Sequence, residues 1–369
     1  MDTPSASRIR VLVVDDSAVS RRLISQALCL DPEIDVVGFA ENGRLALESV
    51  ASDPPDAIVL DLAMPEMDGF ETLRQLKVRF NKIPVLVFSS TAQRGASATV
   101  EALLAGAADY AFKPSTASGS SLPWETARLE LSSKLRAMAA RAQRAAPRPA
   151  VVEAPESPRP TAAPKVPVRA VAIGCSVGGP EALATLIPRL SAGLRVPIFI
   201  VQHMPSSFTA QLAKRLTEKS SVPVLEASHG QTVQSGTVYL APGDYHLRVA
   251  RRQGGIALHL DQGPLENGCR PSVDPLFCSA AEIYGNSLLT VVLTGMGFDG
   301  LVGARAVTAA GGNVWVQDEA SAMVWGMAGA VSRAGLARRT CPLITIAPSI
   351  EAAIARGLPP VRPQSEPRT

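Results

Sequence analysis

The sequence is poor in aromatic residues and in charge, and these shortages exclude some classes of protein. Aromatic residues make up 4% of the 369 residues and charged residues 19%, with a formal net charge of only +3. A nucleic-acid-binding surface needs a strong basic field and stacking rings, so we expect no nucleic-acid partner. With 46% hydrophobic residues the chain is globular, and it is long enough for two domains with hydrophobic cores.

Long apolar runs are also missing. No uninterrupted apolar segment approaches the roughly 18 residues that a membrane-spanning helix requires. The first residues, Met1-Asp2-Thr3-Pro4, lack the basic start and apolar core of a secretory signal. We therefore expect a cytoplasmic protein without membrane insertion.

Cysteine and histidine are scarce and lack the spacing of metal ligands. The five cysteines are an odd number with no C-x-x-C pair, which disfavours disulfides and structural zinc. We expect them to be reduced and mostly buried. The four histidines include no H-x-x-x-H pair, so a histidine metal site is not expected either.

The first part of the chain alternates between two kinds of segment. Expected strands and helices follow each other: strands at 8–16, 35–40, 57–61 and 84–89, and helices at 17–30, 43–52 and 99–104. Alternation of this kind predicts a parallel sheet covered by helices on both faces.

Three carboxylates stand at the ends of these expected strands. Asp15 and Asp16 end the first strand and Asp61 ends the third, so all three should meet at the carboxyl edge of the sheet. Three carboxylates repel one another unless a cation lies among them, and Mg²⁺ suits oxygen ligands. Ser89, at the end of the fourth strand, and Lys113 add a hydroxyl and a positive charge to the same edge.

Together these five residues indicate a site for a phosphoryl group. The metal, the lysine and the hydroxyl would share the phosphoryl oxygens while Asp61 supplies the attacking carboxylate. Taken singly, each residue has another interpretation: an aspartate after a strand often caps a helix, Ser89 could cap locally, and Lys113 could be a solvated charge.

Residues 9–114 resemble a two-component receiver domain. The resemblance rests on the aspartates at 15 and 16, the run Asp61–Gly69, Ser89, and Lys113 followed by proline. It implies a flavodoxin-like fold in which Asp61 accepts a phosphoryl group from a histidine kinase. Tyr110 matches the aromatic position that such domains use as a switch, moving inward when Ser89 turns toward the phosphoryl group; it could also be an ordinary half-buried aromatic residue.

A proline-rich segment follows the first domain. The amphipathic stretch 122–146 predicts the last helix of the receiver. From Pro147 to Pro167, seven of 21 residues are proline, which predicts an extended, semi-rigid tether. We expect a receiver at residues 8–128, a linker at 129–167, a catalytic domain at 168–356 and a flexible tail at 357–369.

The second part again predicts an α/β domain. Strands are expected at 171–174, 196–201, 288–293 and 312–316, with helices at 181–190 and 206–219 and another that ends at Ala310. Residues 236–240 and 256–260 are expected as antiparallel additions near an edge. The doubly wound, mainly parallel sheet that results would place the turns after its strands at one crevice.

Three such turns carry Ser176, His203 and Asp299, the side chains that a serine hydrolase needs. His203 would accept the proton of Ser176, and Asp299 would orient the imidazole. Backbone amides of 295–297 are candidates for the oxyanion hole. Alternatives stay open: the turn around Ser176 could bind an anion, Cys175 could be the nucleophile, Asp299 could cap a helix, and the other histidines could be structural or rival bases.

Residues 168 to about 352 resemble the catalytic domain of the chemotaxis protein-glutamate methylesterases of CheB type. The resemblance rests on five separated stretches: 173–180, 202–205, 241–246, 270–274 and 293–300. It implies that Ser176 is the nucleophile, His203 the base and Asp299 its orienter, with the Met296 amide assisting the oxyanion. Two departures are visible: Cys175 stands where the family often has alanine, and Ala328 where it often has proline.

The resemblance implies a phosphorylation-regulated esterase. Its substrates would be glutamyl methyl esters, and selected glutamines, on the cytoplasmic helices of methyl-accepting chemotaxis receptors, and hydrolysis would need no cofactor. We expect the unphosphorylated receiver to lie across the substrate groove and phosphorylation to loosen it. Two other functions stay open: a receiver-controlled hydrolase of a different ester, and a signalling adaptor that binds without catalysis.

Overall fold

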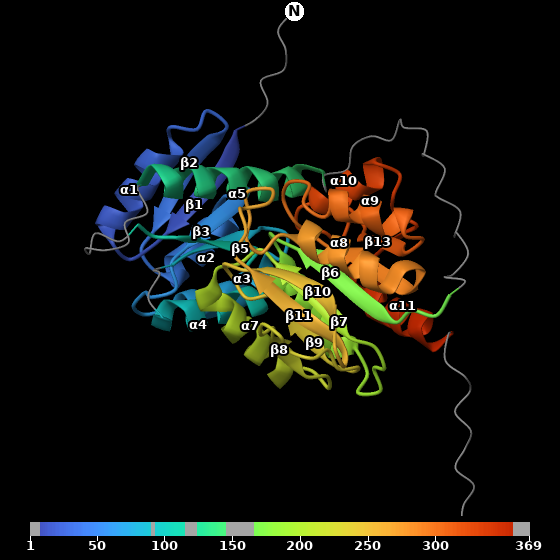
Figure 1. The fold of residues 1–369 in the computed structure, drawn as a ribbon. Coiled ribbons are helices and arrows are strands. Elements are labelled where there is room, and N and C mark those ends of the chain that lie inside the picture. Colours follow the sequence, from blue (N-terminus) through green and yellow to red (C-terminus); the bar gives the residue numbers. More distant parts are fainter. Residues whose placement is uncertain (1–7, 90–92, 115–123, 145–165, 357–369) are drawn as a thin grey trace, which may run out of the picture.

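The computed structural model describes residues 8–89, 93–114, 124–144 and 166–356, which form two α/β domains (Figure 1). The first contains a five-stranded parallel sheet in the order β2-β1-β3-β4-β5. Its strands are β1 (Ile9–Val14), β2 (Ile34–Ala40), β3 (Ala57–Leu60), β4 (Val85–Ser89) and β5 (Asp109–Phe112). Its helices are α1 (Ala18–Leu28), α2 (Gly43–Ser52), α3 (Gly69–Arg79), α4 (Gln93–Leu104) and α5 (Trp124–Arg144).

The expected alternation of strands and helices in this domain is confirmed. Helices α1 and α5 pack on one face of the sheet, against Val11 and Val13, and α2, α3 and α4 pack on the other, against Leu12 and Val14. The strand side chains are apolar on both faces because both faces are covered. Ser17 caps α1 as expected, since its hydroxyl accepts a hydrogen bond from the Ser20 amide.

The expected end of the first domain is corrected by the structure. Residue 128 lies inside α5, a continuous helix, rather than at its end. Leu131, Leu135 and Met138 are buried in the core that α5 shares with α1 and the sheet. The residues from 129 to 144 therefore belong to the first domain, because removing them would expose that core. Apart from residues 166 and 167, the expected tether from Pro147 to Pro167 lies outside the described residues, as does the expected tail at 357–369.

The second domain contains a seven-stranded parallel sheet in the order β14-β13-β12-β6-β7-β9-β8. Its strands are β6 (Ala170–Cys175), β7 (Ile198–Gln202), β8 (Val224–Glu226), β9 (Val238–Leu240), β12 (Leu288–Val292), β13 (Asn313–Gln317) and β14 (Arg339–Cys341). An antiparallel hairpin of β10 (His246–Arg252) and β11 (Gly255–Asp261) stands beside it.

Helices cover both faces of this second sheet. They are α6 (Gly179–Leu186), α7 (Ser206–Glu218), α8 (Val273–Tyr284), α9 (Leu301–Ala309), α10 (Met327–Arg333) and α11 (Leu343–Ala355), with short 3₁₀ turns at Ile187–Arg189 and Gly285–Ser287. Along β6 the side chains alternate: Val171 and Ile173 face α6, α7 and α11, while Ala170 and Ala172 face α8, α9, α10 and the hairpin.

One strand prediction was wrong. Residues 238–240 form β9, which is parallel to both β7 and β8 and lies inside the sheet rather than at its edge. The edge strand β8 is only three residues long, so its apolar pattern is too short to recognise. Residues 256–260 are antiparallel as expected, but they pair with β10 in a separate hairpin.

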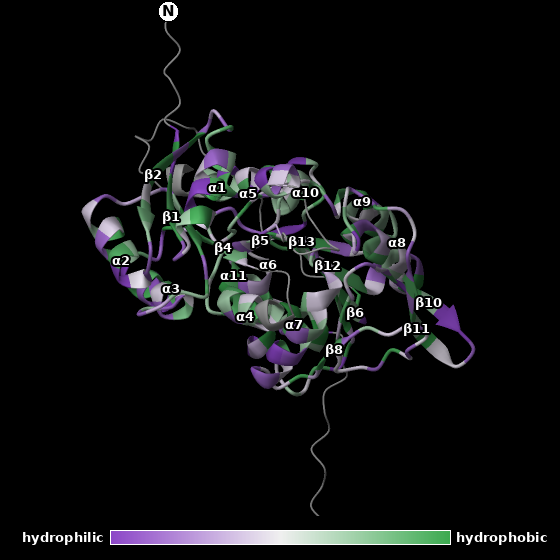
Figure 2. Cartoon of the chain, turned by 90° about the vertical axis from the view of Figure 1, so that its left-hand side faces the viewer, coloured by the Kyte–Doolittle hydropathy of each residue, from purple (hydrophilic) through white to green (hydrophobic). Residues whose placement is uncertain are grey.

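The two domains are in contact through α4 and β5 of the first domain and α6 and α7 of the second. Buried residues of both domains form one continuous hydrophobic cluster, and Figures 1 and 2 both show α4 beside α7. Phe208 of α7 is buried and stacks on Tyr110, with ring centroids 5.0 Å apart. None of the described helices is both long and apolar enough to span a membrane.

Candidate functional site

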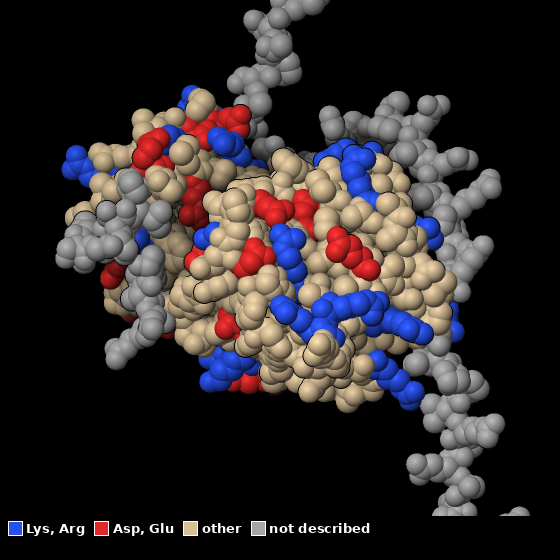
Figure 3. All heavy atoms as spheres, in the orientation of Figure 1, with Lys and Arg blue, Asp and Glu red and all other residues tan. Residues whose placement is uncertain are grey.

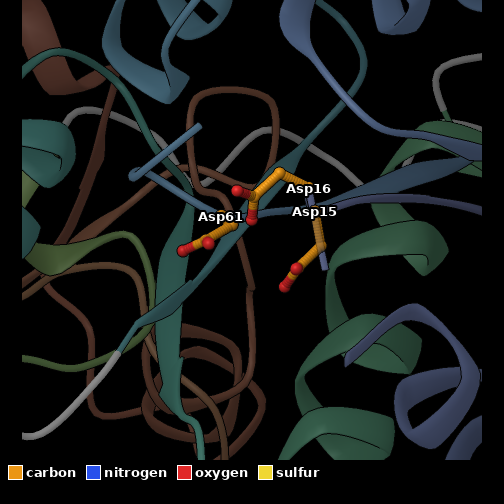
Figure 4. Close-up of side chains that lie close together, drawn as sticks. All are labelled: Asp15, Asp16 and Asp61. Carbon is orange, nitrogen blue, oxygen red and sulfur yellow. The ribbon is translucent and has the colours of Figure 1, made fainter. Parts of the chain in front are cut away.

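The three aspartates predicted to form a metal site do lie together (Figure 4). Asp15 and Asp16 follow β1 and Asp61 follows β3, and one carboxylate oxygen of each lies within 4.8 Å of the others. The strands are neighbours in a parallel sheet, so the residues after them share one edge. An all-oxygen set of this kind fits Mg²⁺, which prefers carboxylate and water ligands.

Lys113 lies between two of these carboxylates. Its ammonium nitrogen is 2.7 Å from Asp15 Oδ2 and 2.8 Å from Asp61 Oδ2. Burial disfavours the ammonium ion, but Asp61 and Asp15 outweigh burial and raise the pKa of Lys113. The Lys113 amide donates to the Ser89 carbonyl at 2.8 Å, which places Ser89 at the same edge. The structure thus gathers all five predicted residues.

Asp61 has the electrostatics of a carboxylate that needs neutralisation. Burial raises its pKa, Lys113 lowers it and Asp15 raises it again, and the net shift is upward. The charge of Lys113 therefore does not fully offset the burial of Asp61 and the nearby charge of Asp15. A cation at the cluster would favour the ionised form of Asp61, which is the form that attacks a phosphorus atom.

Tyr110 lies at the contact between the domains. It is 5% exposed, its ring stacks on Phe208, and its carbonyl accepts a hydrogen bond from Lys134 at 2.6 Å. Phe208 of the second domain thus covers part of the Tyr110 ring, as do Phe112 and Lys134 of the first domain. A rotation of this ring would have to displace Phe208 or leave it uncovered.

The second predicted cluster begins with the turn after β6, which carries Ser176. The Ser176 amide donates to Thr294 O at 3.0 Å, and the Gly179 amide donates back to Ser176 O at 2.8 Å. Gly178 has φ of +75°, and a Cβ there would lie 2.5 Å from Met323 Cβ, so only glycine fits. The turn is tight, and it leaves the Ser176 side chain partly exposed.

His203 and Asp299 form a direct pair. Nε2 of His203 lies 2.7 Å from Oδ2 of Asp299. Asp299 is 3% exposed and accepts further hydrogen bonds from Asn267, Ser272, Val273, Asp274 and Gly300. Burial disfavours its ionised form, but His203 and these donors hold the pKa of Asp299 well below its usual range. The carboxylate therefore carries no proton, so Nε2 must donate and Nδ1 is the basic nitrogen.

Nδ1 of His203 faces a cysteine. Cys269 Sγ lies 3.5 Å from it, whereas Ser176 Oγ has no hydrogen-bond partner among the described residues. Burial disfavours the imidazolium ion, but Asp299 and Cys269 outweigh burial and raise the pKa of His203 to about 9. The structure therefore brings together His203 and Asp299, the predicted base and its predicted orienter. It places Ser176, the predicted nucleophile, on the neighbouring turn without a hydrogen bond to His203.

Gln202 connects the two turns. Its side-chain amide donates to Ser176 O at 3.1 Å and to His203 O at 3.0 Å, and the His203 amide donates to Cys175 O at 3.1 Å. Since β6 and β7 are paired neighbours, these contacts fix the two turns relative to each other.

The rival groups are engaged elsewhere. Cys175 is fully buried, its thiol contacts Val201 O at 3.6 Å, and burial raises its pKa, so it packs inward as expected. His246 is buried and bonded to Pro264 O. His229 and His259 pack against each other with ring centroids 4.9 Å apart. The five cysteines are all free: Cys175 and Cys341 are buried, Cys269 and Cys278 are half-buried, and Cys29 is exposed.

Met296 lies in the loop that follows β12. Strand β12 neighbours β6 on the side away from β7. The Gly295 amide is already bonded to Val324 O at 2.9 Å, so it is not available for an oxyanion. A Cβ on Gly295 would lie 2.9 Å from Ser176 Cβ, which shows how closely this loop approaches the nucleophile turn. The Met296 amide is the next donor along the loop, and its residue is exposed.

Several residues of the site were not predicted from the sequence. They come from the end of β7, from the segment between β11 and α8, and from the first turn of α8: Gln202, Asn267, Cys269, Ser272 and Asp274. Most lie in a loop that follows no strand of the parallel sheet, so the edge rule could not find them. The stretch 270–274 contributed to the resemblance without an assigned role. Asp274, whose pKa burial raises to about 6, shares Asn267 with Asp299.

Comparisons with known proteins find matches for both halves of the chain. The family model described as CheB methylesterase matches residues 171–350, and the response regulator receiver domain matches residues 11–119. A protein-glutamate methylesterase/protein-glutamine glutaminase of Nocardioides sp. is 46% identical over 360 residues, which cover 96% of this chain and 98% of that protein. The chain belongs to the CheB methylesterase family.

One further relative matches nearly the whole chain, and one solved structure matches about half of it. A protein-glutamate methylesterase/protein-glutamine glutaminase of Caulobacter vibrioides is 43% identical over 345 residues, 93% of this chain and 98% of that protein. The CheB methylesterase catalytic domain of Thermotoga maritima is 41% identical and matches 52% of this chain and 100% of that domain, with a TM-score of 0.49. The expected fold class, a receiver joined to a mainly parallel α/β catalytic domain, is confirmed.

Proposed function

We propose that this chain is a phosphorylation-regulated protein-glutamate methylesterase of the cytoplasm. It hydrolyses glutamyl methyl esters, and deamidates selected glutamines, on methyl-accepting chemotaxis receptors, and so provides adaptation in chemotaxis. The names of its full-length relatives support the reaction class. The observation that carries the mechanism is the 2.7 Å contact between His203 and Asp299 beside the turn of Ser176.

The proposed reaction starts when the Ser176 hydroxyl turns toward Nδ1 of His203. The oxygen attacks the ester carbonyl while its proton moves to Nδ1, and Asp299 stabilises the resulting imidazolium. The tetrahedral intermediate collapses, the proton passes to the leaving methoxide, and methanol departs. Water, deprotonated by His203, then cleaves the acyl-enzyme and leaves a free glutamate. For a glutamine, ammonia leaves in place of methanol.

The Met296 amide is proposed to stabilise the oxyanion. Its loop reaches the nucleophile turn, and the neighbouring Gly295 amide is occupied. A backbone donor aimed at the developing charge lowers the barrier by about 3 kcal/mol in hydrolases of this type. No cofactor is needed for this step, because the imidazole handles every proton.

The first domain is proposed to accept a phosphoryl group on Asp61 from a histidine kinase. Asp15, Asp16 and Asp61 would hold Mg²⁺, which supplies positive charge against the phosphoryl oxygens when it is bound. Lys113, already 2.8 Å from Asp61, would contact the same oxygens. Ser89 at the neighbouring strand end would turn its hydroxyl toward the phosphoryl group, and Tyr110 would follow.

The contact between the domains supports regulation of the esterase by the receiver. The Gly178 amide, two residues after Ser176, donates to Ala108 O of the first domain at 3.0 Å. Lys77 also contacts Glu181 of α6 at 3.3 Å. The receiver thus touches the nucleophile turn itself. A movement of Tyr110 against Phe208 would disturb this contact and uncover the substrate groove. A change of about 1 to 3 kcal/mol in the free energy of interaction between the domains would alter activity about 5- to 150-fold.

The proposed chemistry is tested by methanol release from a methylated receptor. Ser176→Ala should lower the rate at least about a thousandfold, because the nucleophile is removed. Cys175→Ala, one residue earlier, is the matched control and should retain activity, since that thiol is buried in the core. Equal methanol release by Ser176→Ala and the native chain would rule out the proposed nucleophile.

A further inference from the structure

A groove lined by arginines lies at the amino ends of strands β6 and β7. The proposed esterase site lies at the carboxyl ends of the same strands. The groove has a volume of about 850 Å³, and residues 167–169 and 195–197, which immediately precede β6 and β7, form part of its wall. Ser176 and His203 follow the other ends of the same strands. Because a strand rises roughly 3.3 Å per residue, the five residues of β7 separate the two edges by roughly 17 Å. The groove is thus distinct from the esterase site.

All the charged side chains that line the groove are basic. Its lining includes four arginines and no aspartate or glutamate. The four are Arg169, Arg195, Arg251 and Arg252. Within the part of the chain that the structure describes, none of them forms an ion pair. Arg251 donates to the carbonyl of Ile283 at 3.4 Å, which ties the hairpin to α8.

Two glutamates lie on helices that contribute to the lining, and neither is an ion-pair partner of the groove arginines among the described residues. Glu351 belongs to α11, as does the lining residue Ile354, but it accepts a hydrogen bond from the Ser191 amide. Glu282 precedes the lining residue Ile283 on α8 without lining the groove itself. Figure 3 shows basic side chains gathered in a band where Figure 1 places the tip of the β10–β11 hairpin and the start of β6.

Apolar side chains lie between the charges. They come from the loop before β9, the hairpin and two helices: Val233, Ile256, Ile283, Tyr284 and Ile354. Burial raises the pKa of Tyr284 to about 12, so its phenol stays neutral and can donate a hydrogen bond. The groove therefore offers both apolar contact and cationic donors. The hairpin that carries two of the arginines extends from the body with a hydrophilic tip (Figure 2).

We propose that this groove docks an acidic, extended segment of a partner protein. The four guanidinium groups are exposed and come from three separate segments, so they face a row of negative charges rather than one enclosed anion. Arginine pairs with carboxylates through two parallel hydrogen bonds, which gives affinity and orientation. The apolar residues between them accommodate the uncharged side chains of such a segment. This docking surface goes beyond the proposed esterase function.

A labelled peptide tests the proposal with the full-length protein. The probe is a fluorescein-labelled decapeptide of alternating glutamate and leucine, followed by fluorescence anisotropy. We expect binding that weakens as salt is raised. Arg169→Glu combined with Arg252→Glu should weaken it at least about tenfold, and the glutamine pair at the same positions should weaken it less. Arg22→Glu combined with Lys82→Glu, exposed positions of the first domain with the same charge change, should bind within about twofold of the native chain.

The same samples separate docking from catalysis. The groove variants should release methanol at the native rate, because they leave the other edge of the sheet intact. Equal peptide affinity in the groove variants and the native chain, or no peptide binding at all, would overturn the proposal. Stronger competition by inorganic pyrophosphate than by unlabelled peptide would also overturn it, since that result identifies a small-anion site.

Discussion

The two ring nitrogens of His203 have different neighbours, and these neighbours affect its acid–base behaviour. Asp299 contacts one ring nitrogen, and the Cys269 thiol lies 3.5 Å from the other, which the proposed mechanism assigns to Ser176. A neutral imidazole has a single lone pair there, so the thiol and the hydroxyl compete for it. The described resting geometry favours the thiol.

The pH dependence of the reaction follows from the raised pKa of His203. The imidazole must be neutral to accept a proton, and a pKa of about 9 keeps it protonated at neutral pH. We expect kcat/KM for methanol release to rise with pH and to level off near pH 9. A profile already flat from pH 6 upward would show that the base titrates normally and that the raised pKa does not govern catalysis.

Cys269→Ala should move this profile. The thiol contributes to the raised pKa of His203, so its removal should shift the acid limb of kcat/KM to lower pH and raise the rate at pH 7. Cys278→Ala, a half-buried thiol of α8, is the matched control and should leave the limb unchanged. If Cys269 had only a structural role, Cys269→Ala would lower the rate of methanol release without shifting the acid limb of the kcat/KM profile.

At the scale of elements, the two turns after β6 and β7 act as a unit held by Gln202. Its amide bonds the carbonyls of both Ser176 and His203, and its Oε1 atom lies against the start of α6, where a Cβ on Gly179 would be only 1.8 Å away. Glycine at 179 is therefore a requirement of packing. The turn geometry depends on that close approach.

Gly179→Ala should reduce catalysis through this contact. The new methyl group must displace the Gln202 side chain, and a shift of the two turns by an ångström lowers kcat by about 100-fold. Gly193→Ala, where the nearest atom to the added Cβ is 3.8 Å away, is the control and should behave as the native chain. Single-turnover methanol release is the measurement, and a native rate for the first variant would contradict the role of Gln202.

Part of this arrangement of strands and turns could be predicted from the sequence, and part could not. Ser176, His203 and Asp299 each follow a strand, and parallel strands put their carboxyl ends on one edge, so their convergence could be predicted. Cys269 and Asn267 reach the same place from a loop with no periodic pattern. The three-residue β8 gave no signal, and the parallel pairing of β9 depends on it. Residues 129–144 were assigned to the linker although their apolar side packs on α1.

At the scale of the molecule, the receiver and the catalytic domain share one hydrophobic cluster that reaches Cys175, next to Ser176. The receiver touches the nucleophile turn through Ala108, and an ion pair between Glu101 of α4 and Arg215 of α7 lies in the same interface. An interface of mixed apolar and charged contacts can be weakened by modest changes.

Charge reversal at this ion pair tests the contact. Arg215→Glu places two negative charges opposite each other and should raise the activity of the unphosphorylated enzyme about 2- to 5-fold. Adding Glu101→Arg restores an attractive pair and should return activity to the native level. Failure of the double variant to reverse the effect would mean that Arg215 acts within α7 alone, where it also contacts Glu218.

In the proposed mechanism, the Ser176 hydroxyl attacks a protein-borne ester, and phosphorylation of the neighbouring receiver domain controls the rate. The most direct measurement is methanol release from a methylated receptor, with and without a small-molecule phosphoryl donor, for the native chain, Asp61→Asn and Ser176→Ala. We predict release that the donor stimulates in the native chain, unstimulated release in Asp61→Asn, and none above background in Ser176→Ala. Native release from Ser176→Ala, or equal stimulation of Asp61→Asn, would contradict the account.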